Sequence, residues 1–234
     1  MSRNIDISIG EFYHIYNRGT EKRKIFLDDS YFERFVALLY LCNSSFPIVM
    51  RRYQGQALAE IMASFERGEA LVDIVGYCLM PNHFHLILRE KRDRGISKFM
   101  LKLLTAYSSY FNIRNDRSGT LFQGRYGAKH LHDDQYVKYC FSYIHLNPVK
   151  LLEPYWDVKG IENIPNALDF LGRYEFSSYK DYIGQNRPCG RLLRKDAFPD
   201  FFNTPVDIRG EIKNWLNYKN NFDYQGQALV GEHE

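Results

Sequence analysis

Residues 71–89 read LVDIVGYCLMPNHFHLILR, and this stretch decides the fold of the chain. The runs 71–79 and 83–89 are rich in apolar and β-branched residues, which is typical of strands. Residues 80–82 separate them with Met-Pro-Asn, whose proline and asparagine favour a tight turn. We therefore predict an antiparallel hairpin over this stretch.

The second run of the hairpin carries two histidines around one phenylalanine. Side chains alternate along a strand, so His83 and His85 lie on one face, ~7 Å apart along the strand, and Phe84 lies on the other. Two such imidazoles can share one cation, although the pattern does not say which cation. Taken alone, paired histidines in a strand are more often surface or core residues.

Outward from the hairpin, hydrophobic periodicity and helix-capping residues predict further strands and helices. The expected elements are a strand over 11–17, a helix from Asp28 or Asp29 to about Asn43, the hairpin, a helix from Ser97 to the region 112–119, a strand within 120–131, and a helix from Asp133 or Asp134 to just before Pro148.

This order, β-α-β-β-α-β followed by a helix, is the ferredoxin-like split βαβ arrangement. It predicts an α+β sandwich, in which an antiparallel sheet carries helices on one face and leaves the other face free for a site. We expect a catalytic domain over 1–184 with a helical insertion at 44–70. An acidic C-terminal extension over 185–234, with a helix near 207–216, is expected to be mobile or separately docked.

Composition indicates a folded protein with an uneven distribution of charge. Of 234 residues, 45% are hydrophobic and 25% charged, which excludes a disordered chain and a membrane-embedded bundle. The net charge of +3 combines a basic segment over 89–130, with ten Lys or Arg against three acids, and an acidic segment over 196–234, with three against seven. Aromatic residues within the basic segment suit a groove for single-stranded nucleic acid, but an ordinary solvated helix face fits equally well.

The sequence also bears on compartment and on the cysteines. We see no secretory signal and no apolar segment long enough to cross a membrane, so we expect a cytoplasmic protein without a membrane partner. The four cysteines form no C-x-x-C pair and are expected to be buried free thiols rather than zinc ligands or disulfides. They are Cys42, Cys78, Cys140 and Cys189.

Near the end of the helix that precedes Pro148, Tyr143 and Asn147 are four residues apart and therefore neighbours on one helical face. Tyrosine can be a covalent nucleophile, but its ordinary pKa of about 10 requires a nearby cation or base. On its own, this pair is more typical of a packing tyrosine and a helix-terminal asparagine. His145 points about 200° around the helix from Tyr143, so we expect it to be a packing residue.

Several motifs occurring together in order resemble the single-tyrosine HUH transposases, in which two histidines flank a hydrophobic residue. The resemblance is strongest to the subgroup associated with repetitive extragenic palindromes, and it covers roughly residues 12–184. The stretches that carry it are YHI at 13–15, NRG at 17–19, MPNHFH at 80–85, LFQGRY at 121–126, YIHLNPVK at 143–150 and the run 173–184.

This resemblance implies a metal-dependent enzyme that acts on single-stranded DNA near a hairpin, as a monomer or a homodimer. His83 and His85 would hold Mg²⁺ or Mn²⁺, with Asn147 as a polar third ligand. Tyr143 would attack the scissile phosphate and form a 5′-phosphotyrosine link and a free 3′-hydroxyl. Because the phosphodiester energy is retained, a 3′-hydroxyl can reverse the step and join strands without ATP.

Four residues are candidates for contacts with DNA. Arg125 and Lys129 precede the tyrosine helix and would bind phosphates, although each also fits ordinary surface charge. Asn17 and Arg18 follow the first strand, where contact with DNA and shaping of the turn are equally good interpretations.

Two other functions fit parts of the sequence. One is a domesticated DNA-binding protein or regulator that binds hairpins without strand transfer, which predicts salt-sensitive binding and no covalent adduct. The other is a hydrolase of a small substrate that binds zinc through His83, His85 and Cys78.

Overall fold

The computed structural model describes residues 6–53, 55–198 and 204–221. The strands are β1 (Phe12–Arg18), β2 (Val72–Met80), β3 (His83–Glu90) and β4 (Gly127–Leu131). The α-helices are α1 (Asp29–Cys42), α2 (Leu58–Ser64), α3 (Gly95–Arg114), α4 (Asp134–Leu146), α5 (Trp156–Lys159), α6 (Ile164–Arg173), α7 (Tyr179–Tyr182) and α8 (Pro205–Asn221).

The four strands form one antiparallel sheet in the order β2-β3-β1-β4. Along the chain, the core elements run β1-α1-β2-β3-α3-β4, which is the ferredoxin-like arrangement predicted from the sequence. The predicted hairpin is confirmed, since β2 and β3 pair from Val72 opposite Glu90 to Met80 opposite His83.

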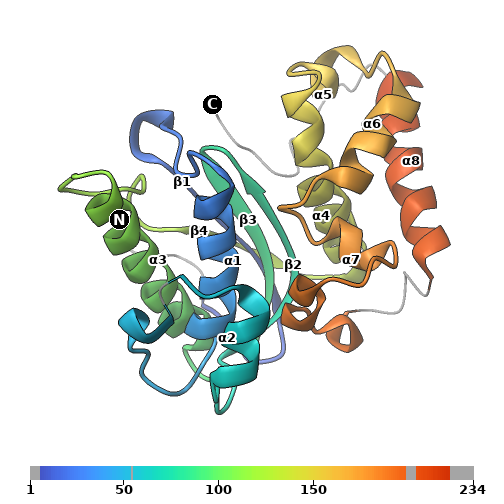
Figure 1. Ribbon diagram of the computed structural model, residues 1–234. Coiled ribbons are helices and arrows are strands. Elements are labelled where there is room, and N and C mark those ends of the chain that lie inside the picture. The colour runs from blue at the N-terminus through green and yellow to red at the C-terminus, as the bar shows by residue number, and fades with distance from the viewer. Residues whose placement is uncertain (1–5, 54, 199–203, 222–234) are drawn as a thin grey trace.

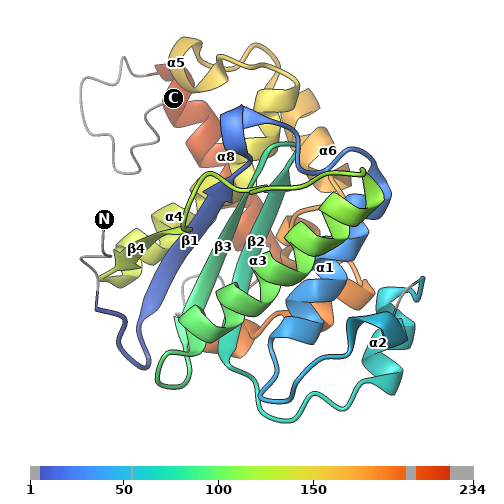
Figure 2. The ribbon, with the colours of Figure 1, turned by 90° about the vertical axis from the view of Figure 1, so that its left-hand side faces the viewer.

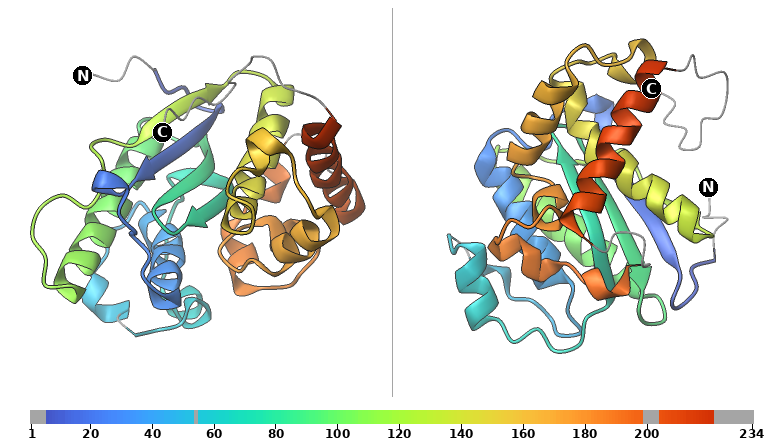
Figure 3. Two further views of the ribbon diagram at one scale, coloured as in Figure 1. Left: turned by 90° about the horizontal axis from the view of Figure 1, so that it is seen from above. Right: turned by 90° about the vertical axis from the view of Figure 1, so that its right-hand side faces the viewer.

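Helices α1 and α3 pack together on one face of the sheet, as predicted, while α4 to α8 lie on its other side (Figure 1). The expectation that this second face is free is wrong, because α4 contacts β2, β3 and β4. Gly76 on β2 permits the close approach: a Cβ there would lie only 3.3 Å from Cδ1 of Ile144. Seen from above, α4 stands next to the sheet and α8 stands beyond it (Figure 3, left).

The first turns of α1 and α3 are both capped by a carboxylate. Asp28 caps α1 as predicted, since its carboxylate accepts a hydrogen bond of 2.9 Å from the backbone N–H of Ser30. The predicted cap at Ser97 is wrong, because α3 begins two residues earlier. The Glu90 carboxylate, at the end of β3, instead accepts bonds from the N–H groups of Gly95 and Ile96 at 2.8 and 2.7 Å.

Helix α4 follows β4 after two residues and has the predicted limits. Asp133 caps it, accepting a bond of 2.7 Å from the N–H of Tyr136. Its end at Leu146 leads directly into a 3₁₀ turn over Asn147–Leu151, since proline at 148 cannot continue the α-helical hydrogen bonding.

The insertion 44–70 contains α2 and lies beside α1, away from α4 (Figure 2). The described part of the C-terminal extension is docked, because α8 packs on α4, α5 and α6. Glu211 pairs with Lys138 at 3.0 Å, and the Trp215 ring meets the Tyr139 ring edge-on at 5.1 Å between centroids. Residues 222–234 of the predicted extension lie outside the described residues.

All four cysteines are free thiols, as expected. Cys42, Cys78 and Cys140 are buried, and Cys189 is partly exposed. Within the described ranges, every helix is too short or too polar to cross a membrane.

Candidate active site

The two histidines of β3 face the side of the sheet on which α4 lies. Their ring centroids are 5.0 Å apart and the rings are nearly perpendicular. Phe84, between them, points to the other face and is fully buried against Phe35 and Phe122. The alternation predicted from the sequence is confirmed, and both imidazoles reach the same side.

Helix α4 brings Tyr143 to this pair. The Tyr143 ring lies edge-on to the His85 ring, 5.6 Å away between centroids, and the tyrosine is partly exposed. Asn147 lies one turn further on and is only 3% exposed. Its amide Nδ2 donates to the carbonyl oxygen of Tyr143 at 3.1 Å, which uses the nitrogen end of the amide and not the oxygen end. The structure therefore brings Tyr143 against His85 and His83 beside His85, and Asn147 lies one helical turn beyond Tyr143.

The electrostatics around His83 and His85 favour neutral imidazoles and a negatively charged ligand. Burial, followed by the charges of Arg18 and Lys150, lowers the pKa of His83 to about 3. Burial and the neighbouring imidazoles of His83 and His14 hold the pKa of His85 well below its ordinary value. Neutral imidazole is the form that ligates a cation, and the two basic side chains suit a phosphate.

The donor set fits a divalent cation. Nδ1 of His83 lies 2.6 Å from Oδ1 of Asn82, so that nitrogen carries the proton and the ligating lone pair is on Nε2. Among the described residues, this buried Nε2 has no hydrogen-bond partner. A buried lone pair beside a second imidazole, with an amide on the adjoining helix, is what a metal ligand set provides. We conclude that His83, His85 and Asn147 have the chemistry that such a set requires.

The zinc alternative loses support. Cys78 is directly opposite His85 in the β2–β3 ladder, and its side chain is fully buried. In the ranges that the structure describes, no three His, Cys, Asp or Glu side chains gather as a possible metal site.

The predicted DNA-binding residues lie in three places. Arg18 is opposite His83 in the sheet, and Lys129 is opposite His14, so both lie on the face that carries the histidines. Arg125 is exposed in the loop before β4. Asn17 is on the other face of β1 and 5% exposed, and its Oδ1 accepts a bond from the N–H of Arg18 at 2.8 Å. Its position favours the shaping of the turn.

Comparison with known proteins identifies the family. A family model described as "Transposase IS200 like" matches residues 13–147, which is more than half of the chain and includes every catalytic and metal-binding candidate above. The chain belongs to the IS200-like transposase family. The resemblance seen in the motifs is thereby confirmed at the level of the family.

Similarity beyond the family model is distant. One solved structure, of a REP-associated tyrosine transposase bound to a REP hairpin, aligns with 79% of this IS200-like transposase and 86% of its own chain. The sequence identity is 14% and the TM-score 0.49. Among curated proteins, no significant match is found.

Sequence reasoning missed two residues in the site of this IS200-like transposase. His14 of β1 is buried, with Nε2 only 2.9 Å from Nδ1 of His85. Tyr16, also on β1, lies over Gly127 of β4, where a Cβ would come within 2.4 Å of the tyrosine ring. Alternation along β1 places both side chains on one face of the sheet. They lie beside the histidines only because β1 and β3 are neighbours in the strand order.

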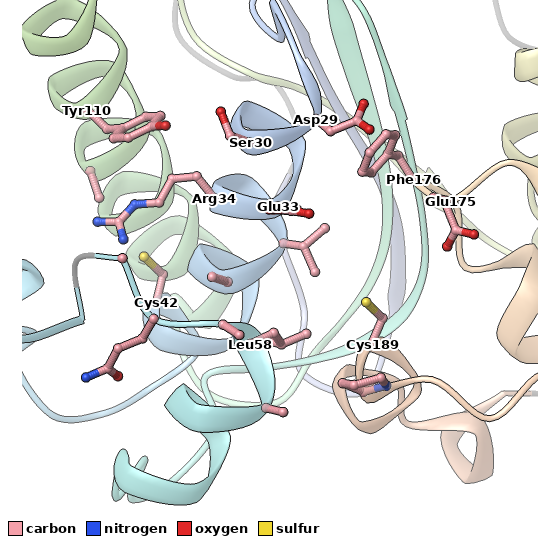
Figure 4. Close-up of a pocket in the computed structure, with 18 of the residues that line it drawn as sticks. Asp29, Ser30, Glu33, Arg34, Cys42, Leu58, Tyr110, Glu175, Phe176 and Cys189 are labelled. Atoms are coloured by element: carbon pink, nitrogen blue, oxygen red, sulfur yellow. The ribbon is translucent and has the colours of Figure 1, made fainter.

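A groove of about 1740 Å³ lies elsewhere in this transposase, between α1, α3, the insertion and residues 185–189 (Figure 4). Its lining mixes basic side chains such as Arg34 and Lys102 with the acids Asp29 and Glu33. None of the residues of the candidate active site lines it. The mixed charges indicate no single ligand, so we place the chemistry at the sheet and α4.

Proposed function

We propose that this member of the IS200-like family is a metal-dependent transposase that cleaves and rejoins single-stranded, hairpin-associated DNA through Tyr143. The observation that carries the proposal is the position of Tyr143. A partly exposed phenol stands against the buried ring of His85, which neighbours His83, and Asn147 follows one helical turn later.

In the proposed step, Oη of Tyr143 attacks the scissile phosphorus. The Oη–P bond forms and the P–O3′ bond breaks, so the downstream strand becomes a 5′-phosphotyrosine and the upstream strand leaves with a 3′-hydroxyl. The phenolic proton passes to solvent, and the departing 3′ oxygen takes up a proton from solvent. One phosphodiester replaces another, so a 3′-hydroxyl can attack the adduct and rejoin DNA without ATP.

His83, His85 and Asn147 would hold the cation. When bound, Mg²⁺ or Mn²⁺ supplies positive charge that polarises the phosphate and stabilises the oxygens that gain charge. The side chains of the protein orient the reacting groups: α4 fixes Tyr143 beside the pair, and such positioning contributes much of the rate.

The proposed partner is DNA with an unpaired strand next to a hairpin. Burial first lowers the pKa values of His83 and His14, and the positive charges of Arg18 and Lys150 near His83 and of Lys129 near His14 lower them further. Contacts of this kind bind phosphates without reading sequence. The hairpin requirement is proposed from the motifs shared with the palindrome-associated subgroup.

The test uses one hairpin oligonucleotide with a single-stranded flank, labelled in separate reactions at its 3′ or its 5′ end, with Mg²⁺ or Mn²⁺. We expect the 3′ label to migrate with the denatured protein and the 5′ label to leave on a shorter strand that ends in a 3′-hydroxyl. Adding chelator should prevent both results.

Tyr143→Phe should abolish the adduct while retaining affinity for the hairpin. Tyr139→Phe is the matched control, because Tyr139 is one turn earlier, stacks on Tyr143 and should leave the adduct in place. An adduct formed by Tyr143→Phe would exclude the role assigned to this tyrosine. Hairpin binding by the wild-type chain with no adduct at any metal concentration would favour the regulator instead.

A further inference from the structure

Two buried imidazoles meet between β1 and β3. Nε2 of His14 lies 2.9 Å from Nδ1 of His85, and the rings are 5.1 Å apart at 21°. His14 is 1% exposed and His85 is fully buried. They are diagonal neighbours in the sheet, since His85 is opposite Tyr16 and His14 is opposite Ile87. A hydrogen bond between two neutral imidazoles requires one ring to donate and the other to accept.

Only one of the two possible proton arrangements suits a cation. If His14 donates from Nε2–H, Nδ1 of His85 is the acceptor and the proton of His85 is on Nε2, which blocks ligation. If His85 donates from Nδ1–H, its Nε2 carries the lone pair and the proton of His14 is on Nδ1. The choice between these tautomers therefore decides whether His85 can be a ligand.

We propose that His14 is a positioning residue of the site, which accepts the hydrogen bond from Nδ1–H of His85 and thereby keeps Nε2 of His85 available for the divalent cation. This inference rests on the proposed metal dependence. It assigns to His14 no direct contact with the cation, because the Nε2 of His14 is already directed at His85.

The other histidine of the pair has a partner of the same kind. Nδ1 of His83 is 2.6 Å from Oδ1 of Asn82, and Nδ2 of Asn82 donates to the Lys22 carbonyl at 3.3 Å, which fixes the orientation of the amide. An amide oxygen can only accept, so the tautomer of His83 is determined. His14 has the corresponding place beside His85, and partners of this kind orient ligands and increase their basicity.

The surroundings of His14 hold its ring in place. Its ring lies 5.0 Å from that of Tyr16 and meets the Tyr143 ring edge-on at 6.1 Å. Lys129 lies opposite it on β4. The described residues provide no hydrogen-bond partner for Nδ1 of His14. Within the described residues, the bond to His85 is therefore the one hydrogen bond that the ring of His14 makes.

The test measures Mn²⁺ affinity without DNA, from the electron paramagnetic resonance signal of the free ion. His14→Phe keeps a ring but removes the acceptor, and we expect affinity to fall about 10–100-fold. His14→Gln offers an amide oxygen near the position of Nε2 and should restore most of the affinity. His130→Phe, the same change at an exposed histidine of β4, should leave it unchanged. Thermal unfolding of each metal-free variant verifies folding.

A second readout uses the unaltered protein. In the Mg²⁺-loaded wild-type chain, ¹⁵N chemical shifts should place the proton of His85 on Nδ1, and a proton on Nε2 would overturn the inference. Loss of Mn²⁺ in His85→Ala together with wild-type affinity in His14→Phe would overturn this inference alone. If the wild-type chain binds no Mn²⁺, the proposed metal dependence fails and this inference fails with it.

Discussion

Tyr143 and His145 are two residues apart on α4, but their side chains point to different parts of the molecule. His145 is fully buried, its Nδ1–H donates to the carbonyl of Phe141, and its Nε2 accepts from the Ser178 hydroxyl, both at 2.7 Å. The packing role expected from its direction on the helix is confirmed. The bond to Ser178 ties α4 to the segment that lies along β2, because Ser178 also accepts from the N–H of Tyr77.

This burial makes the stability of the metal-free protein depend on pH. Burial lowers the pKa of His145 to about 3, and its contacts, Ser178, Phe141, Tyr179 and Tyr182, carry no charge. Between pH 6.5 and 3 the unfolded chain binds a proton that folded His145 does not, so the free energy of unfolding should fall as pH falls. Each such histidine can change the free energy of unfolding by at most about 1.4 kcal/mol per pH unit.

His145→Gln removes this titration, so its free energy of unfolding should depend less steeply on pH, between about 6.5 and about 5, than that of the wild-type chain. Urea denaturation at several pH values, in chelator, measures both slopes. Equal slopes would contradict the assignment of a neutral, buried His145.

At the same scale, the sequence predicted His83 and His85 but not the role of His14. The period of two along a strand is local, so it places two histidines on one face from three residues of sequence. His14 meets His85 only because β1 pairs with β3, and that choice depends on the packing of the whole sheet.

Among the elements, the strands and the long helices of the core could be predicted and the short helices after 150 could not. Helix α6 is an exception, since Asn163 caps it and Pro165 stands in its first turn, a signal that the sequence does contain. The start of α3 could not be read from Ser97, because its cap comes from the end of β3.

Helix α8 provides the clearest prediction at the element scale. Ile212 is fully buried in its inner face, so Ile212→Ala should lower the free energy of unfolding by about 2–5 kcal/mol. Asn214, two residues on, is exposed, and Asn214→Ala should change little. Chemical denaturation compares the two variants, and equal stabilities would show that α8 is not docked in solution.

For the whole molecule, the order of strands and helices was enough to predict the ferredoxin-like core, because few topologies accommodate β-α-β-β-α-β. The sequence left open whether the extension is mobile or docked, and it could not show where α8 packs. The charges of 196–234 suggested a separate acidic tail, yet Glu211 pairs with Lys138, which is far away in the sequence. A pairing between such distant residues leaves no local pattern.

The basic face should dominate the binding of DNA. Arg18→Ala with Lys129→Ala should weaken hairpin binding and reduce the slope of log K against log[NaCl] by about 0.7–0.9 for each phosphate that the variant no longer neutralises. Lys98→Ala is the control, because Lys98 is exposed on α3, the helix on the other face of the sheet. Fluorescence anisotropy across a salt series measures this. An unchanged slope in the double variant would place the DNA elsewhere.

Helix α4 is held at both ends, by Glu211 of α8 on Lys138 near its start and by Ser178 on His145 near its end. These two contacts would hold Tyr143 in a fixed position. In the proposed reaction, an exchange of strands at Tyr143 would then require the DNA to move: the attached end would stay in place while the free ends change places around it.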